Sequence, residues 1–214
     1  MASTSFNEFR YNMHDAKRLH QAHGVLSTAT PGKKGLGHIT RSGVVMLCAA
    51  WERYHESVLV EGVSYLSREI YEPNNLPLSV RKHLSAIAKQ SVHELKPMEL
   101  AGNGWRALYV AQATDETGSL NTPKSGKLKT LYERLAGVPD VSTFWTIGAQ
   151  PIDDFVSTRG DIAHNGRKSP YITAGTLNYY INMIQDAAAE HDHNFCDYLK
   201  TTSGATVQPW RKTA

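Results

Sequence analysis

Between Ser42 and about Tyr71, apolar side chains recur at positions i, i+3, i+4 and i+7, which is the spacing of one face of an α-helix. The residues of this apolar face are Val44, Leu47, Cys48, Trp51, His55, Val58, Leu59, Gly62 and Leu66. Charged side chains such as Glu52 and Arg68 fall off the face. Because other helices must cover an apolar face of this length, the segment predicts a long core helix inside a helical bundle.

Helical periodicity recurs along the rest of the chain, while the alternation of apolar and polar residues that marks β-strands is scarce. No internal repeat and no strand–helix–strand rhythm is present in the sequence. The other predicted helices span residues 6–26, 78–97, 98–113, 128–135, 151–164 and 173–200. We therefore predict an all-α fold, a bundle of five to seven helices.

Two stretches rich in glycine, proline and polar residues predict loops, namely ATPGKKGLG at 29–37 and DETGSLNTPKSGK at 115–127. We expect residues 1–39 to form an N-terminal helix and a flexible loop, and residues 40–200 to form the helical bundle. Residues 201–214 are expected to be a poorly ordered C-terminal tail.

The composition is that of an ordinary soluble protein with one core, because 41% of the 214 residues are hydrophobic and 20% are charged. The sequence contains no apolar run of about 18 residues and no signal-peptide pattern, so we expect a cytoplasmic protein that binds no membrane. Cys48 and Cys196 lie far apart in helical segments, which favours buried reduced thiols over a disulfide or a zinc site. The net charge of +3 permits a polyanionic partner without requiring one.

The segment RGDIAHNG, residues 159–166, places Arg159 five positions before His164 at a predicted helix end. Arg159 falls on the apolar side of its helix with Phe155 and Ile162, where a guanidinium needs an acceptor or water. On an ideal helix His164 is turned by about 140° from Arg159 and lies about 7.5 Å further along. The two side chains can therefore meet through the reach of arginine, through a loosened last turn, or across a two-fold axis that brings a second copy alongside.

An ordinary structural role also accounts for both residues. Arg159 then pairs with a carboxylate at the edge of the core, such as Asp154 or Glu52, and His164 occupies a helix C-terminus, where positive charge is favourable. The spacing alone favours this interpretation, because arginine and histidine five residues apart often arise by chance. The surrounding sequence has to decide between the two.

That surrounding sequence resembles the HEPN superfamily (higher eukaryotes and prokaryotes nucleotide-binding). The motif R159-GDIA-H164, followed by a small residue and a turn, resembles the Rx4–6H motif of that superfamily. The upstream segment AAWERYHESVLVEGVSYL, residues 49–66, is similar to a helix of the RiboL-PSP-type HEPN group. The resemblance extends over most of residues 40–200.

Membership of this superfamily implies an antiparallel helical bundle, commonly a homodimer in which the motif helices of two protomers face one another. It also implies an endoribonuclease that uses no metal or other cofactor and takes RNA as its substrate. Such proteins often belong to toxin–antitoxin or anti-phage systems, in which an antitoxin or another defence protein is the partner. The resemblance assigns the motif roles to Arg159 and His164.

This chain departs from the superfamily pattern in two places. Gly160 stands where a polar residue often follows the motif arginine, and this departure argues against catalytic activity. Asn165 and Gly166 follow His164, so the HxY sequence of one toxin subgroup is absent. The second departure argues against a tyrosine modified by a nucleotidyltransferase partner.

The chemistry of RNA cleavage suits these residue types. Without a metal, the reaction needs a base for the 2′-hydroxyl proton, an acid for the 5′-oxygen leaving group and a cation for the pentavalent phosphorane. Imidazole suits the first two tasks, and guanidinium is a permanently charged, bidentate phosphate ligand. We therefore expect His164 and Arg159 to act together, with Asp161 orienting the imidazole from three residues upstream.

Other polar residues are candidates for supporting roles. Glu52 either holds Arg159 or lines the cleft, and Asn165 either donates to a phosphate or caps the helix, of which the cap is favoured. The HDH sequence at 191–193 lacks a spaced third metal ligand and predicts a polar helix end. Basic runs most often form a solvated surface, but they predict secondary contacts to RNA phosphates for Lys33, Lys34, Lys124 and Lys127.

Two other functions fit the same residues. A HEPN-like module without catalysis would bind a nucleotide or a protein partner, and the Gly160 departure favours it. A purely structural helical adaptor would require Arg159 to be satisfied internally and His164 to face solvent alone.

Overall fold

The computed structural model describes residues 2–28 and 35–212, and every regular element within these two ranges is helical. Three short 3₁₀ helices, Pro73–Asn75, Val141–Phe144 and Gly166–Lys168, interrupt the connections. The α-helices are α1 (Thr4–Thr28), α2 (Gly37–Glu69), α3 (Leu78–Gln90), α4 (Lys96–Glu99), α5 (Gly104–Gly118), α6 (Ser125–Ala136), α7 (Ala149–Asn165) and α8 (Ala174–Ser203). The predicted all-α fold class is confirmed.

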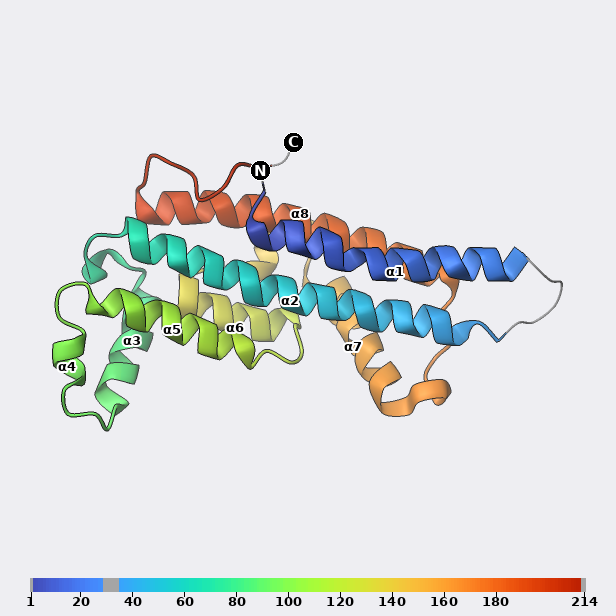
Figure 1. Ribbon diagram of the computed structural model, residues 1–214, viewed down its shortest axis with the longest axis horizontal. Coiled ribbons are helices and arrows are strands. Elements are labelled where there is room, and N and C mark those ends of the chain that lie inside the picture. The colour runs from blue at the N-terminus through green and yellow to red at the C-terminus, as the bar shows by residue number, and fades with distance from the viewer. Residues whose placement is uncertain (1, 29–34, 213–214) are drawn as a thin grey trace.

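The long helix α2 is the centre of the bundle (Figure 1). Helices α1 and α8 lie along it, and α1 runs antiparallel to both. Helices α5 and α6 pack on the C-terminal half of α2, and α7 packs on its N-terminal half. This arrangement brings the end of α7 close to the beginning of α2, although the two segments are far apart in the sequence.

The sequence periodicity predicts the buried face of α2 correctly. All nine residues of its apolar stripe are buried, and so are the neighbouring aromatic residues Tyr54 and Tyr65. The helix is longer than expected at its start, because it begins at Gly37 and includes Ile39 and Thr40 as further buried residues. Cys48 and Cys196 are both free and buried, as expected.

Two glycines of α2 allow α8 to approach closely. A Cβ placed on Gly43 would lie 2.6 Å from a methyl carbon of Leu177, and one on Gly62 would lie 2.6 Å from the ring of Phe195. Since contacts this short do not occur between real atoms, the missing side chains set the distance between α2 and α8.

The HDH sequence is not the polar helix end that we predicted. His191 and Asp192 are both 0% exposed, because α8 continues past them to Ser203 and packs them against the rest of the bundle. The imidazole Nδ1 of His191 lies 3.0 Å from the hydroxyl of Tyr54. Asp192 accepts hydrogen bonds from the backbone N–H and the hydroxyl of Ser3, which lies just before α1.

The C-terminal segment is anchored rather than poorly ordered up to residue 212. The indole of Trp210 is buried and donates a hydrogen bond to the backbone carbonyl of Asp192 at 3.2 Å. The hydroxyl of Tyr65 donates to the carbonyl of Val207 at 2.6 Å. Sequence composition suggested a loose tail, but one large aromatic side chain that finds a buried hydrogen-bond acceptor is enough to fix it.

Other predicted boundaries were also wrong: α6 begins at Ser125, inside the predicted loop, and α5 begins at Gly104 instead of near residue 98. The residues DETG, expected to begin a loop, continue α5 as far as Gly118, because Ala113 and Thr117 are buried one turn apart. Helix α3 ends at Gln90 instead of continuing towards Pro97. In the part of the chain that the structure describes, no helix combines the length and apolar character needed to cross a bilayer.

Candidate functional site

Helix α7, which carries the Arg159 and His164 motif, is fixed to the bundle by its apolar face and by one carboxylate. Ile152, Phe155, Val156 and Ile162 are buried, which holds the helix against α2. Asp153 accepts hydrogen bonds of 2.7 Å from both the backbone N–H and the hydroxyl of Ser125, at the first turn of α6. A carboxylate there satisfies free N–H groups and complements the helix dipole, so α6 and α7 are held together.

Arg159 lies on this inner side of α7, half-buried, as the helical spacing predicts. Its charge acts on two residues of α2 that are one helical turn apart, Cys48 and Glu52. Burial raises the pKa of the Cys48 thiol to about 12, and the guanidinium opposes this rise. Arg159 therefore faces α2 and is not directed towards the outer surface of α7.

Glu52 is a half-buried carboxylate beside this arginine. Burial raises the pKa of Glu52 and the Arg159 guanidinium lowers it, while Glu56 raises it and Lys127 lowers it by smaller amounts. The Oε2 atom of Glu52 is buried and has no hydrogen-bond partner. Asp154, the other predicted partner of Arg159, instead accepts a hydrogen bond from Gln150 at 2.8 Å.

Within the described residues, neither carboxylate forms a hydrogen bond or a close ion pair with Arg159. The ordinary structural role predicted such a pair. The guanidinium of Arg159 instead lies within electrostatic range of the Glu52 carboxylate. Among the described residues, its N–H groups donate to no protein acceptor.

His164 occupies the last turn of α7 and is exposed. Asp161 and Asn165 are exposed on the same end of the helix. Because α7 is helical through Asn165, His164 and Arg159 project to different sides, and one copy of the chain does not bring them together. The Asn165 side chain makes no capping hydrogen bond, and Gly166, with φ of 52°, ends the helix instead. The favoured capping role for Asn165 was therefore wrong.

A groove of about 400 Å³ lies where the end of α7 meets the beginning of α2. Ile162 and Gly166, which flank His164 in the sequence, belong to its wall. Three basic residues line it, namely His38, Arg41 and Arg167, together with Ser42, Val45 and Met46. The groove is not evident in the sequence, because its two walls are more than a hundred residues apart in the chain. The helical repeat of positions 38, 41, 42, 45 and 46 was the available signal.

The structure describes two of the four lysines that were predicted to contact RNA phosphates. Lys33 and Lys34 lie outside the described residues. Lys127 is exposed, donates to the side chain of Asn121 at 3.0 Å, and is near enough to Glu52 to lower its pKa. Lys124 is half-buried at the start of α6. Of these lysines, Lys127 has the clearest electrostatic link to the Arg159 region.

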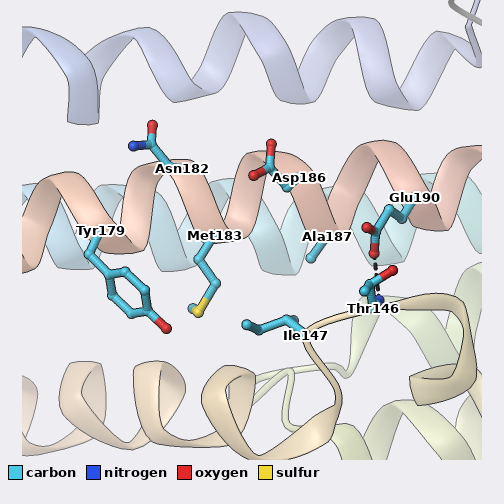
Figure 2. Close-up of a pocket in the computed structure, with 8 residues that line it drawn as sticks. All are labelled: Thr146, Ile147, Tyr179, Asn182, Met183, Asp186, Ala187 and Glu190. Carbon is cyan, nitrogen blue, oxygen red and sulfur yellow. Dashed lines mark hydrogen bonds between the residues drawn. The ribbon is translucent and has the colours of Figure 1, made fainter.

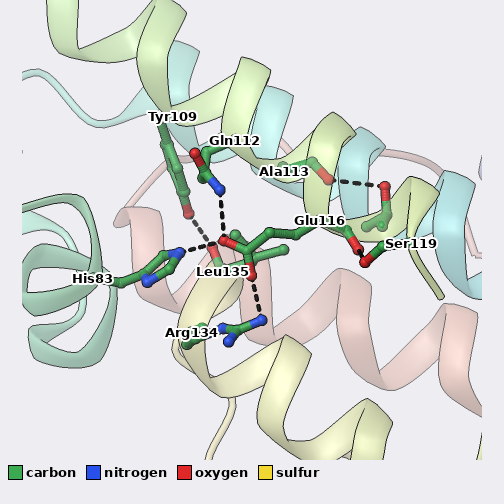
Figure 3. Close-up of polar contacts among 9 residues, drawn as sticks. His83, Tyr109, Gln112, Ala113, Glu116, Ser119, Arg134 and Leu135 are labelled. Carbon is green, nitrogen blue, oxygen red and sulfur yellow. Dashed lines mark hydrogen bonds and ion pairs between the residues drawn. The ribbon is translucent and has the colours of Figure 1, made fainter. Parts of the chain in front are cut away.

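The rest of the basic run on α6 is already paired with acids. Lys129 contacts Asp140 at 3.2 Å, and Arg134 forms an ion pair with Glu116. Figure 3 shows that the side chains of His83 and Gln112 also contact the Glu116 carboxylate, so three side chains converge on one half-buried carboxylate. These pairs neutralise much of the positive charge, which makes this part of α6 a poor phosphate-binding surface.

A second groove, of about 380 Å³, lies between α8 and the segment that precedes α7 (Figure 2). Its floor includes Met183 and Ile147, and its polar residues include Asp186 and Glu190. Glu190 accepts a hydrogen bond from the backbone N–H of Thr146 at 2.6 Å, which fixes the edge of the groove. Among the described residues, two carboxylates and no basic side chain line it, so its charge is opposite to that of the groove between α2 and the end of α7.

Among residues 2–28 and 35–212, no three or more His, Cys, Asp or Glu side chains are grouped so that they could hold a metal ion. A family model described as RiboL-PSP-HEPN matches residues 12–197 of the chain. No curated protein and no solved structure shows significant similarity to it.

Proposed function

The chain belongs to the RiboL-PSP-HEPN family, and from this membership we propose that it is a metal-independent endoribonuclease. In this proposal Arg159 and His164 act in one composite site between two copies of the chain. The observation that carries it is the position of Arg159, a half-buried guanidinium that lies beside Glu52 and forms no close ion pair with it. A half-buried guanidinium without a protein acceptor is available to water or to an anionic ligand, and RNA phosphate is a matching ligand.

The need for two copies follows from the directions of the two side chains. Arg159 faces α2 and His164 is exposed on another side of α7. A second α7 helix packed along the first would supply its own His164 and Arg159 to a shared cleft. Gly160 supports this arrangement, because within the described part of the chain nothing beyond its own stretch of helix lies within 4 Å of the place where its Cβ would be, so that side of α7 is open to a neighbour.

Each residue has a defined role in the proposed reaction. His164 of one or both copies takes the 2′-hydroxyl proton and returns a proton to the 5′-oxygen that leaves, so the products carry a 2′,3′-cyclic phosphate and a 5′-hydroxyl. Arg159 stabilises the additional negative charge of the phosphorane. Asp161 is a positioning residue on the exposed turn before His164, and Asn165, free of a capping role, donates to a phosphate oxygen.

We further propose that the enzyme works in the cytoplasm in toxin–antitoxin or anti-phage defence, with a neutralising protein as partner. Family membership supports this proposal. A protein that cuts cellular RNA without a metal cofactor would require such control. Toxicity on expression in bacteria, relieved by His164→Ala, is the corresponding test in cells.

The biochemical test is cleavage of labelled RNA in excess EDTA by the purified protein. We expect cleavage to products that end in a 2′,3′-cyclic phosphate, and a loss of at least about a hundredfold in His164→Ala, since general acid–base catalysis contributes about that much or more. His93→Ala is the matched control, because His93 is an exposed histidine far from α7 whose imidazole pairs with Glu99. Equal cleavage by His164→Ala and His93→Ala would disprove the proposal. RNA binding without cleavage would instead identify a non-catalytic module.

A further inference from the structure

The groove between the beginning of α2 and the end of α7 combines charge with an apolar floor. Its basic residues are His38 and Arg41 from α2 and Arg167 from the turn after α7. Val45, Met46 and Ile162 supply the apolar floor, and none of the described residues that line the groove is acidic. Met46 is 40% exposed, so part of this floor is open to solvent.

Arg41 lies beside an exposed aromatic ring. A Cβ placed on Gly37 would be 3.0 Å from a terminal guanidinium nitrogen of Arg41 and 3.3 Å from a ring carbon of Tyr171. The two side chains therefore converge over Gly37, which has no side chain to separate them. Tyr171 is 68% exposed, so its ring is accessible for stacking.

His38 is held in a defined tautomer at the mouth of the groove. Its Nδ1 atom lies 3.2 Å from the carbonyl oxygen of Gly35. A carbonyl oxygen can only accept, so Nδ1 carries the proton of the neutral ring and Nε2 remains an acceptor. An acceptor of this kind is suited to a ribose hydroxyl or a base N–H group.

From these contacts we propose that this groove binds a single-stranded segment of RNA next to the bond that is cut, an inference that rests on the proposed nuclease function. Arg41 and Arg167 bind the phosphates, and one base lies on Val45, Met46 and Ile162, with the ring of Tyr171 available for the next. Unpaired bases on apolar or aromatic surfaces and phosphates on arginines are the usual elements of single-strand recognition. A duplex would keep its bases stacked and would leave the apolar floor unused.

The test measures the binding of a labelled, single-stranded 2′-O-methyl oligoribonucleotide by fluorescence anisotropy at several salt concentrations. This probe lacks the 2′-hydroxyl and is not cut by the proposed reaction, so binding is measured on the intact wild-type chain. We expect Arg41→Ala and Arg167→Ala each to weaken binding roughly fivefold. In a plot of the logarithm of the binding constant against the logarithm of the salt concentration, each substitution should reduce the magnitude of the slope by about one.

Met46→Glu provides a second kind of variant at an exposed position, and it should weaken binding at least as much because it adds negative charge to the groove floor. Arg68→Ala is the matched control, since Arg68 is exposed at the far end of the same helix, and Met46→Leu controls for the loss of methionine. Both controls should bind as the wild type does. Thermal melting of every variant separates lost binding from lost folding.

The outcomes distinguish this inference from the proposed function. If unmodified RNA is cut but the groove variants bind the probe like Arg68→Ala, the inference is wrong and the nuclease proposal stands. If RNA is not cut but the groove variants lose binding, the groove assignment stands and the nuclease proposal fails. An absence of binding by the wild type overturns the inference, and it would direct attention to a protein as the occupant of the groove.

Discussion

The guanidinium of Arg159 lies close enough to Glu52 to lower the pKa of that carboxyl group, yet Glu52 keeps a buried oxygen without any hydrogen-bond partner. The contact between α2 and α7 thus holds two opposite charges in electrostatic range without joining them. We interpret Glu52 as a residue that tunes the potential at Arg159, leaving the guanidinium available to a phosphate.

Glu52→Gln should increase the affinity for RNA severalfold, because it removes a negative charge that repels phosphate at Arg159. Anisotropy with the uncleavable probe measures this change. Glu69→Gln, which removes an exposed carboxylate at the other end of α2, should leave the affinity unchanged. Weaker binding by Glu52→Gln would show that the carboxylate positions Arg159 instead.

The same substitution should raise the free energy of unfolding at about pH 7. Because burial raises the pKa of Glu52 in the folded chain, ionising this side chain destabilises the fold at pH values above its ordinary value of 4.5. The gain from Glu52→Gln should therefore be present at neutral pH and disappear as the pH falls below that value. Urea unfolding at the two pH values tests the sign, and a gain confined to acid would contradict it.

Gly160→Ala should stabilise an isolated chain and impair cleavage. Glycine inside a helix lowers stability by about 0.5–1 kcal/mol relative to alanine, and a Cβ at residue 160 meets no atom within 4 Å. If α7 packs on a second α7, the same methyl group would enter the contact and reduce RNA cleavage. Denaturant unfolding at low protein concentration and the EDTA-resistant cleavage assay measure the two effects.

Gly126→Ala is the control for that experiment, because Gly126 is another helical glycine whose Cβ would meet no neighbour within 4 Å. It should leave cleavage unchanged. Cleavage by Gly160→Ala at the wild-type rate would contradict packing between copies at this glycine.

The protein should lose stability as the pH falls below about 6.5, because of two buried histidines. Burial lowers the pKa of His191 to about 3 and that of His55 well below its ordinary value of 6.5. In the unfolded chain both rings bind protons near pH 6.5, so the unfolded state gains protons that the folded state does not. Each ring should contribute a slope of about 1.4 kcal/mol per pH unit between pH 6.5 and the folded pKa.

Urea unfolding between pH 7 and pH 5 measures this slope. The raised pKa values of Asp192 and Glu52 act in the opposite direction, beginning near their ordinary values of 3.8 and 4.5. His191→Phe should reduce the slope of unfolding free energy against pH by about 1.4 kcal/mol per pH unit, which corresponds to one proton. A free energy of unfolding that is constant over this range would show that the buried histidines are not neutral.

The elements with strong periodicity could be predicted from the sequence, and the long-range contacts could not. The stripe of α2 identifies its buried face because each apolar residue lies three or four positions from the next. The burial of His191 and Trp210 was not predicted, because their partners are distant in the sequence. Tyr54 contacts the ring of His191, and a backbone carbonyl of α8 accepts a hydrogen bond from the indole of Trp210. Local polarity does not reveal such partners.

The candidate site shows the same division. Arg159 was placed correctly on the inner side of α7, since Phe155 and Ile162 determine that side. The neighbouring groove was missed, because His38 and Arg41 approach Arg167 only through the packing of α2 on α7. The sequence also did not reveal that the Asn165 side chain forms no capping hydrogen bond. The backbone conformation of Gly166 ends the helix in place of Asn165.

The most direct test of the composite site mixes two inactive proteins. Arg159→Ala and His164→Ala are each assayed alone and after being unfolded and refolded together in equal amounts, with RNA cleavage measured in EDTA. A mixed pair retains one intact arginine and one intact histidine in the shared cleft, so we predict that the mixture cuts RNA while each variant alone does not. A mixture as inactive as its components, beside an active wild type treated in the same way, would contradict the account.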